Sequence, residues 1–209
     1  MKIPKNYFLI EVEKPYDDTV ELNGTEIALD IKWDPYKFAR QYGVVYETPT
    51  WLPEGLDFDV KKGDKVYFHH HVTGSVGAVT VDQKFESDSS QDFKSQNLIT
   101  WIDKENIYKV HWQQMYARVR DGELKMLHHW NFVEQKTEDE DSIKTESGIF
   151  IKPEVEDINL HGNILHMNDW MEEQGVKVGD EVIFSENSEY EMTIEGEKMN
   201  EESRYISII

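Results

Sequence analysis

The chain has 209 residues, which is enough for one large domain or for two domains of about 100 residues each. Its 42 acidic residues against 22 basic ones give a formal net charge of −20, and an acidic surface of this kind repels nucleic acids and anionic membranes. The absence of cysteine excludes disulfides, thiolate metal sites and cysteine nucleophiles, and no apolar run approaches the roughly 20 residues of a membrane span.

The chain reads mostly as short β-strands separated by polar turns. Runs rich in Val, Ile, Tyr, Phe and Trp predict strands at 7–13, 42–47, 64–72, 97–102, 106–112, 115–127, 129–135, 147–153, 162–167, 180–186 and 205–209. In the run 115–127, the dipeptide Asp121-Gly122 predicts a hairpin turn. Few segments show a helical period, so we expect an all-β chain built from small barrels or sandwiches.

Three polar segments between these strands read as loops. Residues 14–41 are acidic at first and aromatic later, residues 84–96 are rich in Ser, Asp and Gln, and residues 136–147 are an acidic run. Long segments of this kind are uncommon in a compact protein and are usually functional or disordered. We therefore expect long mobile loops.

A nine-residue motif occurs twice in the chain. "VKKGDKVYF" at 60–68 and "VKVGDEVIF" at 176–184 share six identical residues. In each copy Gly and Asp favour a tight turn, and the residues that follow alternate between the two faces of a strand. The surrounding features also keep one order, from an aromatic-led strand through a polar loop with an apolar island to a strand that begins near a Gly. This order predicts two domains of one architecture.

The whole series resembles the chaperonin-10 co-chaperonins, the GroES type. "KIPKNYFLIEVE" and "KMLHHWNFVEQ" correspond to the first strand of that family, and "ENIYKV" and "SRYISII" correspond to its last strand. The resemblance implies two tandem GroES-like small β-barrels with long mobile loops. It places a first domain at 1–112, a connecting hairpin at 113–124 and a second domain at 125–209.

The sequence departs from the family pattern in its loops and in its tandem arrangement. The Gly-Gly pair of the family's mobile loop is reduced to Asn23-Gly24 and to Ser147-Gly148. The second copy lacks most of the segment that carries a roof hairpin in the family, whose members form rings of single domains. The strong divergence and the acidity resemble those of a viral or phage co-chaperonin.

The resemblance implies a co-chaperonin that caps an ATP-driven chaperonin ring of the GroEL type and assists protein folding. It implies a homo-oligomeric ring in the cytoplasm, which is the host's cytoplasm for a viral protein. It also implies no enzymatic activity and no cofactor, because the partner chaperonin binds the ATP.

The implied chaperonin-binding residues are the apolar tripeptides of the two loops, each preceded by a loop glycine, Gly24 or Gly148. These residues are Ile27, Ala28 and Leu29 in the first loop and Ile149, Phe150 and Ile151 in the second. We favour the second loop for docking, because the aromatic residues Trp33, Tyr36 and Phe38 indicate that the first folds back on its barrel.

Two other interpretations stay open at this point. Each tripeptide could instead be a buried strand, and the chain could be a tandem β-barrel structural or assembly protein of a virion without chaperonin binding. A zinc-dependent medium-chain dehydrogenase, which contains a similar barrel, is a poor fit. The segment "TGSVGAV" at 73–79 lacks the glycine spacing of a dinucleotide site.

Three consecutive histidines, His69 to His71, lie within the predicted strand 64–72. Neighbours in a strand face opposite sides, so only His69 and His71 would share an ion. Two ligands do not make a zinc site, and we predict that the chain has no metal site.

Overall fold

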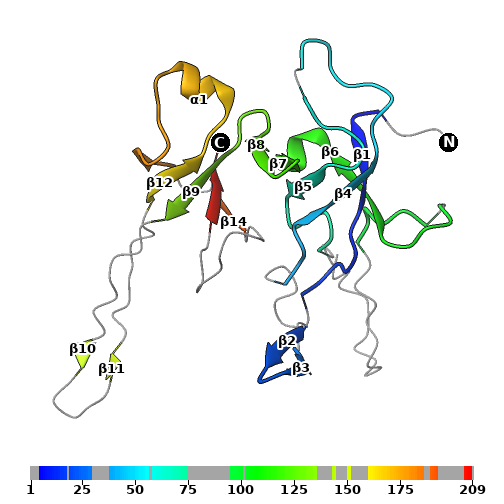
Figure 1. Ribbon diagram of the computed structural model, residues 1–209, viewed down its shortest axis with the longest axis horizontal. Helices are drawn as coiled ribbons and strands as arrows, with labels where there is room; N and C mark the ends of the chain where they lie inside the picture. Colours follow the sequence, from blue (N-terminus) through cyan, green and yellow to red (C-terminus); the bar gives the residue numbers. More distant parts are fainter. Residues whose placement is uncertain are drawn as a thin grey trace, which may run out of the picture. The chain divides into compact units, whose positions relative to one another are not determined.

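The computed structural model describes residues 5–17, 19–29, 38–56, 58–74, 95–100, 102–135, 143–144, 150–151, 160–185, 189–192 and 205–208. The chain divides into two compact units, Met1–His128 and His129–Ile209, which we call unit 1 and unit 2. The described residues form antiparallel sheets and one short α-helix, as expected for an all-β chain (Figure 1). Among them, no helix is long and apolar enough to cross a membrane.

Unit 1 is built on a six-stranded antiparallel sheet with the order β6-β1-β4-β5-β7-β8. Its strands are β1 (Tyr7–Glu11), β4 (Tyr42–Glu47), β5 (Lys65–Phe68), β6 (Ile107–His111), β7 (Met115–Arg120) and β8 (Glu123–Met126). The predicted strand 97–102 differs, since its described residues make only an isolated bridge between Leu98 and Tyr108.

Strand β1 is buried on both of its faces. Phe8 and Ile10 point into one apolar cluster, which also includes Val66 and Phe68 of β5. Leu9 points to the other side and packs against a second cluster with Ile107. Each of these side chains contributes about 1.5–3 kcal/mol to folding through its burial, which is why the aromatic-led run predicts a strand so reliably.

The hairpin predicted around Asp121-Gly122 is confirmed, but its place differs from the expectation. Asp121 and Gly122 have φ angles of 52° and 83° and join β7 to β8. Strand β7 also pairs with β5, so the whole hairpin lies in the sheet of unit 1. The two units therefore meet between His128 and His129, a few residues after the expected connection at 113–124.

Unit 1 also contains a separate two-stranded sheet, formed by β2 (Thr19–Leu22) and β3 (Thr25–Ala28). The turn between them is Asn23-Gly24, with φ angles of 52° and 77°. Two successive positive φ angles are the geometry that Asn-Gly favours in a two-residue hairpin. The segment 14–41, which the sequence predicts as a loop, thus contains a hairpin.

Unit 2 is built on a five-stranded antiparallel sheet with the order β13-β12-β9-β15-β14. Its strands are β9 (Asn131–Gln135), β12 (His161–His166), β13 (Glu181–Ile183), β14 (Glu189–Met192) and β15 (Tyr205–Ile208). A separate two-stranded sheet pairs β10 (Ile143–Lys144) with β11 (Phe150–Ile151). Helix α1 (Asp169–Glu173) begins after Asn168, whose side chain accepts a hydrogen bond from the Met171 N–H.

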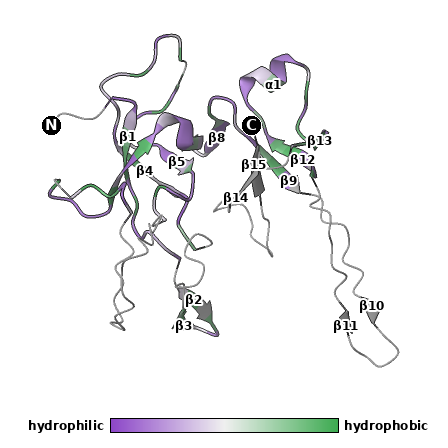
Figure 2. Ribbon diagram, turned by 180° about the vertical axis from the view of Figure 1, so that it is seen from behind, coloured by the Kyte–Doolittle hydropathy of each residue, from purple (hydrophilic) through white to green (hydrophobic). Residues whose placement is uncertain are grey.

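The core of unit 2 lies where β9, β12 and the residue after β13 meet. Val133, Ile164 and Phe184 are buried together, with Met171 of α1 packed against them. Figure 2 shows the hydrophobic colouring of β9 and β12 beside the mostly hydrophilic helix α1. The helix was not predicted, because five residues are too few to show a period.

Four strands of unit 2 repeat the arrangement of four strands of unit 1. The order β15-β9-β12-β13 corresponds to β6-β1-β4-β5, with every neighbouring pair antiparallel. Gly43 of β4 lies opposite Val66 of β5, and Gly162 of β12 lies opposite Val182 of β13. Closure of either sheet into a barrel stays a prediction.

The repeated Gly-Asp turns make the same backbone hydrogen bonds in both units. The Gly63 N–H donates to the Val45 carbonyl at 2.9 Å, and the Gly179 N–H donates to the Ile164 carbonyl at 2.7 Å. A side-chain oxygen of Asp64 accepts from the Lys61 N–H at 2.7 Å, just as Asp180 accepts from Lys177 at 2.9 Å. The sequence motif therefore encodes one turn geometry twice.

Candidate functional site

The hairpin β2–β3 carries an exposed apolar face. Val20 lies directly opposite Ile27 in the pairing register, and Leu22 follows on the same face two residues after Val20. Leu29 continues the row two residues after Ile27. The exposed fractions of these side chains are 45% for Val20, 58% for Leu22, 41% for Ile27 and 36% for Leu29. We call this set, Val20, Leu22, Ile27 and Leu29, the hairpin apolar face.

Such a face is unusual on a sheet of two strands. Single exposed apolar residues are ordinary, but several gathered on one face indicate a binding surface. A two-stranded hairpin has little stability of its own, and β2–β3 is joined to no other sheet among the described residues. The opposite face carries Thr19, Glu26 and Ala28, so the hairpin is amphipathic. A partner that covers the apolar face would therefore also stabilise the hairpin.

The base of the hairpin is attached to the body of unit 1. Tyr16 and Ala39 are both buried and form an antiparallel bridge. The Asp17 N–H donates to the Phe38 carbonyl at 2.8 Å, and the Arg40 side chain pairs with the carboxylate of Asp17. The two ends of the segment are thus held together, while β2 and β3 extend beyond them.

The structure separates the residues predicted in the first loop. Ile27 and Leu29 belong to the hairpin apolar face, whereas Ala28 lies on the opposite face of β3. Val20 and Leu22 are not among the docking residues that the family resemblance implies. Alternating residues on both sides of an Asn-Gly pair predict a hairpin, and that signal would have placed both residues beside Ile27.

Two of the four residues predicted in the second loop lie among the described residues. Ile149 and Gly148 lie outside the described residues, as do Trp33 and Tyr36 of the first loop. Phe150 and Ile151 form β11, whose backbone pairs with β10. The preference for the second loop as the docking segment stays a prediction.

A cluster of charged residues beside the first Gly-Asp turn has a structural role. The guanidinium of Arg120 donates to Asp64 at 2.7 and 2.8 Å, and Arg118 donates to Asp59 at 3.0 Å. Hydrogen bonds from Arg120, followed by those from Arg118, lower the pKa of Asp59 to about 2. Hydrogen bonding from Arg120 likewise lowers the pKa of Asp64. These carboxylates stay ionised and paired, which suits a cross-link and not proton transfer.

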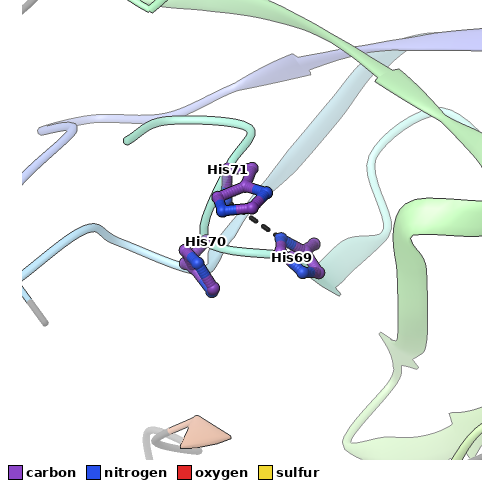
Figure 3. Close-up of side chains that lie close together, drawn as sticks. All are labelled: His69, His70 and His71. Carbon is purple, nitrogen blue, oxygen red and sulfur yellow. Dashed lines mark hydrogen bonds between the residues drawn. The ribbon is translucent and has the colours of Figure 1, made fainter. Parts of the chain in front are cut away.

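The histidine run lies outside a strand, so the expected alternation of its side chains is wrong. Strand β5 ends at Phe68, and His69 to His71 form a turn in which the three rings approach one another (Figure 3). The ring centroids are 4.3 Å apart for His69 and His70, 4.4 Å for His69 and His71, and 4.2 Å for His70 and His71.

Comparison with known proteins gives one match. Residues 123–202 match the family model of the chaperonin 10 kDa subunit. The matched region is less than half of the chain and runs from β8 through β14, so it covers most of unit 2. It supports the resemblance to the chaperonin-10 family there. No curated protein and no solved structure matches the chain.

Proposed function

We propose that this chain is a co-chaperonin that caps a GroEL-type chaperonin ring and assists protein folding. The observation that carries the proposal is the match of residues 123–202 to the chaperonin 10 kDa subunit. In this function the chain has no catalytic residue and no cofactor of its own, and the partner ring binds and hydrolyses the ATP. The chain acts in the cytoplasm as a homo-oligomeric ring, in an infected host if the protein is viral.

Unit 1 is, in this proposal, a second and more divergent copy of the same domain. The strand order β6-β1-β4-β5 and the Gly-Asp turn support this assignment, because both recur in unit 2 with the same register. Each unit also carries a two-stranded sheet between its first strand and its Gly-containing strand, β2–β3 in unit 1 and β10–β11 in unit 2. The chain would then present two docking segments, one from each unit.

The docking segment supported by side-chain positions is the hairpin apolar face. Burying an exposed aliphatic side chain contributes about 1.5–3 kcal/mol before the cost of ordering is subtracted. A single hairpin would therefore bind weakly. Several hairpins on one oligomer raise the effective concentration of each, so the summed binding is strong while each contact stays reversible. This combination suits a lid that must leave the chaperonin in every ATP cycle.

The proposal is tested by mixing the full chain with a purified GroEL-type ring and measuring co-sedimentation with and without ATP. We expect nucleotide-dependent binding that falls more than tenfold when Leu22 and Ile27 are both changed to Asp. A second variant, with Ile149→Asp and Phe150→Asp, measures the contribution of the segment in unit 2. Trp51→Asp is the matched control, because Trp51 is 49% exposed in unit 1 and lies outside the hairpin.

The result distinguishes two functions. Binding of the wild-type chain that is lost in the hairpin variant and kept in the Trp51 variant supports the co-chaperonin function. A wild-type chain that binds neither a host ring nor a virus-encoded ring, with or without nucleotide, overturns it and favours a structural protein built from tandem β-domains.

A further inference from the structure

The histidine turn after β5 has an ordered backbone. The Phe68 N–H donates to the Gln41 carbonyl at 2.8 Å, and the His69 N–H donates to the Gln114 carbonyl at 2.9 Å. The turn then closes on itself through the Val72 N–H, which donates to the His69 carbonyl at 2.9 Å. Hydrogen bonds to two separate segments thus fix the start of the turn on which the three imidazole rings stand.

The three rings offer a compact set of nitrogen ligands. One ring nitrogen from each of His69, His70 and His71 lies within 4.8 Å of the other two. Three nitrogens bound to one zinc ion in tetrahedral geometry are about 3.3 Å apart, given zinc–nitrogen bonds of about 2.0–2.1 Å. The difference between these two spacings is small enough that rotation of the side chains can bring the three nitrogens to the spacing of a zinc site. His71 is exposed and His70 only half-buried, so both rings have room to rotate.

A metal ion binds the lone pair of a neutral imidazole, and a histidine with an ordinary pKa of about 6.5 is mostly neutral at pH 7.

One hydrogen bond limits which ions can bind. Nδ1 of His69 accepts a hydrogen bond from the His71 N–H at 3.1 Å, drawn as a dashed line in Figure 3. The proton of the neutral His69 ring is then on Nε2. An ion that takes the Nδ1 lone pair replaces this hydrogen bond, so only a metal with a high affinity for imidazole gains from binding. Zn²⁺ and Cu²⁺ are such metals, whereas Mg²⁺ and Ca²⁺ prefer the oxygen ligands that this group lacks.

We propose that His69, His70 and His71 bind one divalent transition-metal ion of the Zn²⁺ class. Water occupies the remaining coordination position, because three protein ligands leave one position of a tetrahedral ion open. Within the described part of the chain this is the one group of three His, Asp or Glu side chains with ligand atoms so close together. Because the ligands are consecutive residues, the bound ion stabilises the turn that follows β5, and through it unit 1.

The test uses the full chain, stripped of metal with a chelator and dialysed, and titrated with ZnCl₂ by calorimetry. The buffer contains excess MgCl₂, which saturates weak binding to the acidic surface. We expect one equivalent of Zn²⁺ to bind. His70→Asn and His71→Asn should each weaken binding more than tenfold, while His161→Asn, an exposed histidine of β12, should change it less than twofold.

Two further measurements separate a metal site from a general effect on folding. Circular dichroism should show that the His70 and His71 variants keep the wild-type spectrum, since neither side chain belongs to the apolar core. Saturating Zn²⁺ should raise the urea midpoint of unit 1, measured by hydrogen exchange, and leave that of unit 2 unchanged. A wild-type chain that binds no Zn²⁺ in this buffer overturns the proposal. So does a double variant, His70→Asn with His71→Asn, that binds as tightly as the wild type.

Discussion

Units 1 and 2 contain the same Gly-Asp turn in two different environments. Asp64 is 4% exposed and accepts hydrogen bonds from Arg120, which comes from strand β7. Asp180 makes the same backbone contact within its turn, but its side chain is exposed. The difference arises because β5 pairs with β7, whereas β13 is the edge strand of the described sheet. The repeated motif thus specifies the geometry of the turn. The burial and the charge pairing of its Asp side chain depend on whether a further strand, such as β7 in unit 1, lies beside it.

The first prediction has the largest expected effect. It tests whether β4 and β12, the two strands that contain Gly43 and Gly162, are packed equally tightly in their units. A Cβ at Gly43 would lie 2.5 Å from the Glu11 carbonyl oxygen, and a Cβ at Gly162 would lie 2.2 Å from Cγ1 of Val133. Neither position has room for a methyl group, so Gly43→Ala and Gly162→Ala should each destabilise their own unit by about 3 kcal/mol. Urea unfolding followed by hydrogen exchange in each unit measures this.

The matched control is Val44→Ala, since Val44 is the next residue of β4 and is 45% exposed. Its effect should stay below about 1 kcal/mol. If Gly43→Ala leaves unit 1 as stable as this control while Gly162→Ala unfolds unit 2, the two strands are not equivalent in their packing.

The second prediction concerns the difference between the two Asp residues. Asp64→Asn keeps an acceptor for the Lys61 N–H but removes the charge that pairs with Arg120, so unit 1 should lose about 2 kcal/mol of stability. Asp180→Asn should change unit 2 by less than about 0.5 kcal/mol, because its carboxylate is exposed. The same unfolding measurement applies. Equal losses of stability in the two units would contradict this prediction. They would show that the contacts within the turn, and not the pairing with Arg120 of β7, determine the loss.

The third prediction concerns a pH dependence of unit 1. The pKa values of His69 and His70 are about 3 and about 4 in the folded chain, against 6.5 for an ordinary histidine. The unfolded chain therefore binds more protons below pH 6.5, and the stability of unit 1 should fall as the pH drops from about 6.5 toward 4. Asp59 and Asp64, whose pKa values are lowered in the folded chain, contribute in the same direction only below about pH 5, because the unfolded chain binds protons at these carboxyls near pH 3.8.

The measurement is the urea midpoint of unit 1 between pH 7.5 and 4.5 in the presence of a chelator, which removes any metal. His70→Gln should reduce the pH dependence without abolishing it, because His69, His111 and His128 of unit 1 also have lowered pKa values. His161→Gln in unit 2 should leave it unchanged. A wild-type midpoint for unit 1 that does not move with pH in this range would contradict the burial of these rings.

The sequence predicts those parts of the fold in which one local signal decides the structure. The repeated motif predicts both Gly-Asp turns, and Asp121-Gly122 predicts the β7–β8 hairpin, because Gly and Asp tolerate positive φ angles that other residues avoid. The motif does not predict that β7 pairs with β5, since that pairing joins residues far apart in the chain. The same long-range pairing places the boundary between the two compact units after His128.

The candidate site could be predicted in part. The family resemblance names Ile27 and Leu29 as candidates, whereas Val20 and Leu22 become candidates only when the Asn23-Gly24 turn is recognised as a hairpin. The histidine cluster could not be predicted from spacing. Its geometry depends on the end of β5 at Phe68, and the apolar run that precedes it gives no signal for that end.

The pairing of the first and last strands in each unit has a consequence for folding during synthesis. Strand β1 pairs with β6, about 100 residues later, and β9 pairs with β15, about 70 residues later. Contacts so distant in sequence form slowly, because a long loop must close before they are gained. Unit 1 can complete its sheet once β8 has left the ribosome. In unit 2, β9 has no β15 to pair with until residues 205–208 have been synthesised. During that period the unpaired edge of β9 is exposed, and an exposed strand edge favours aggregation.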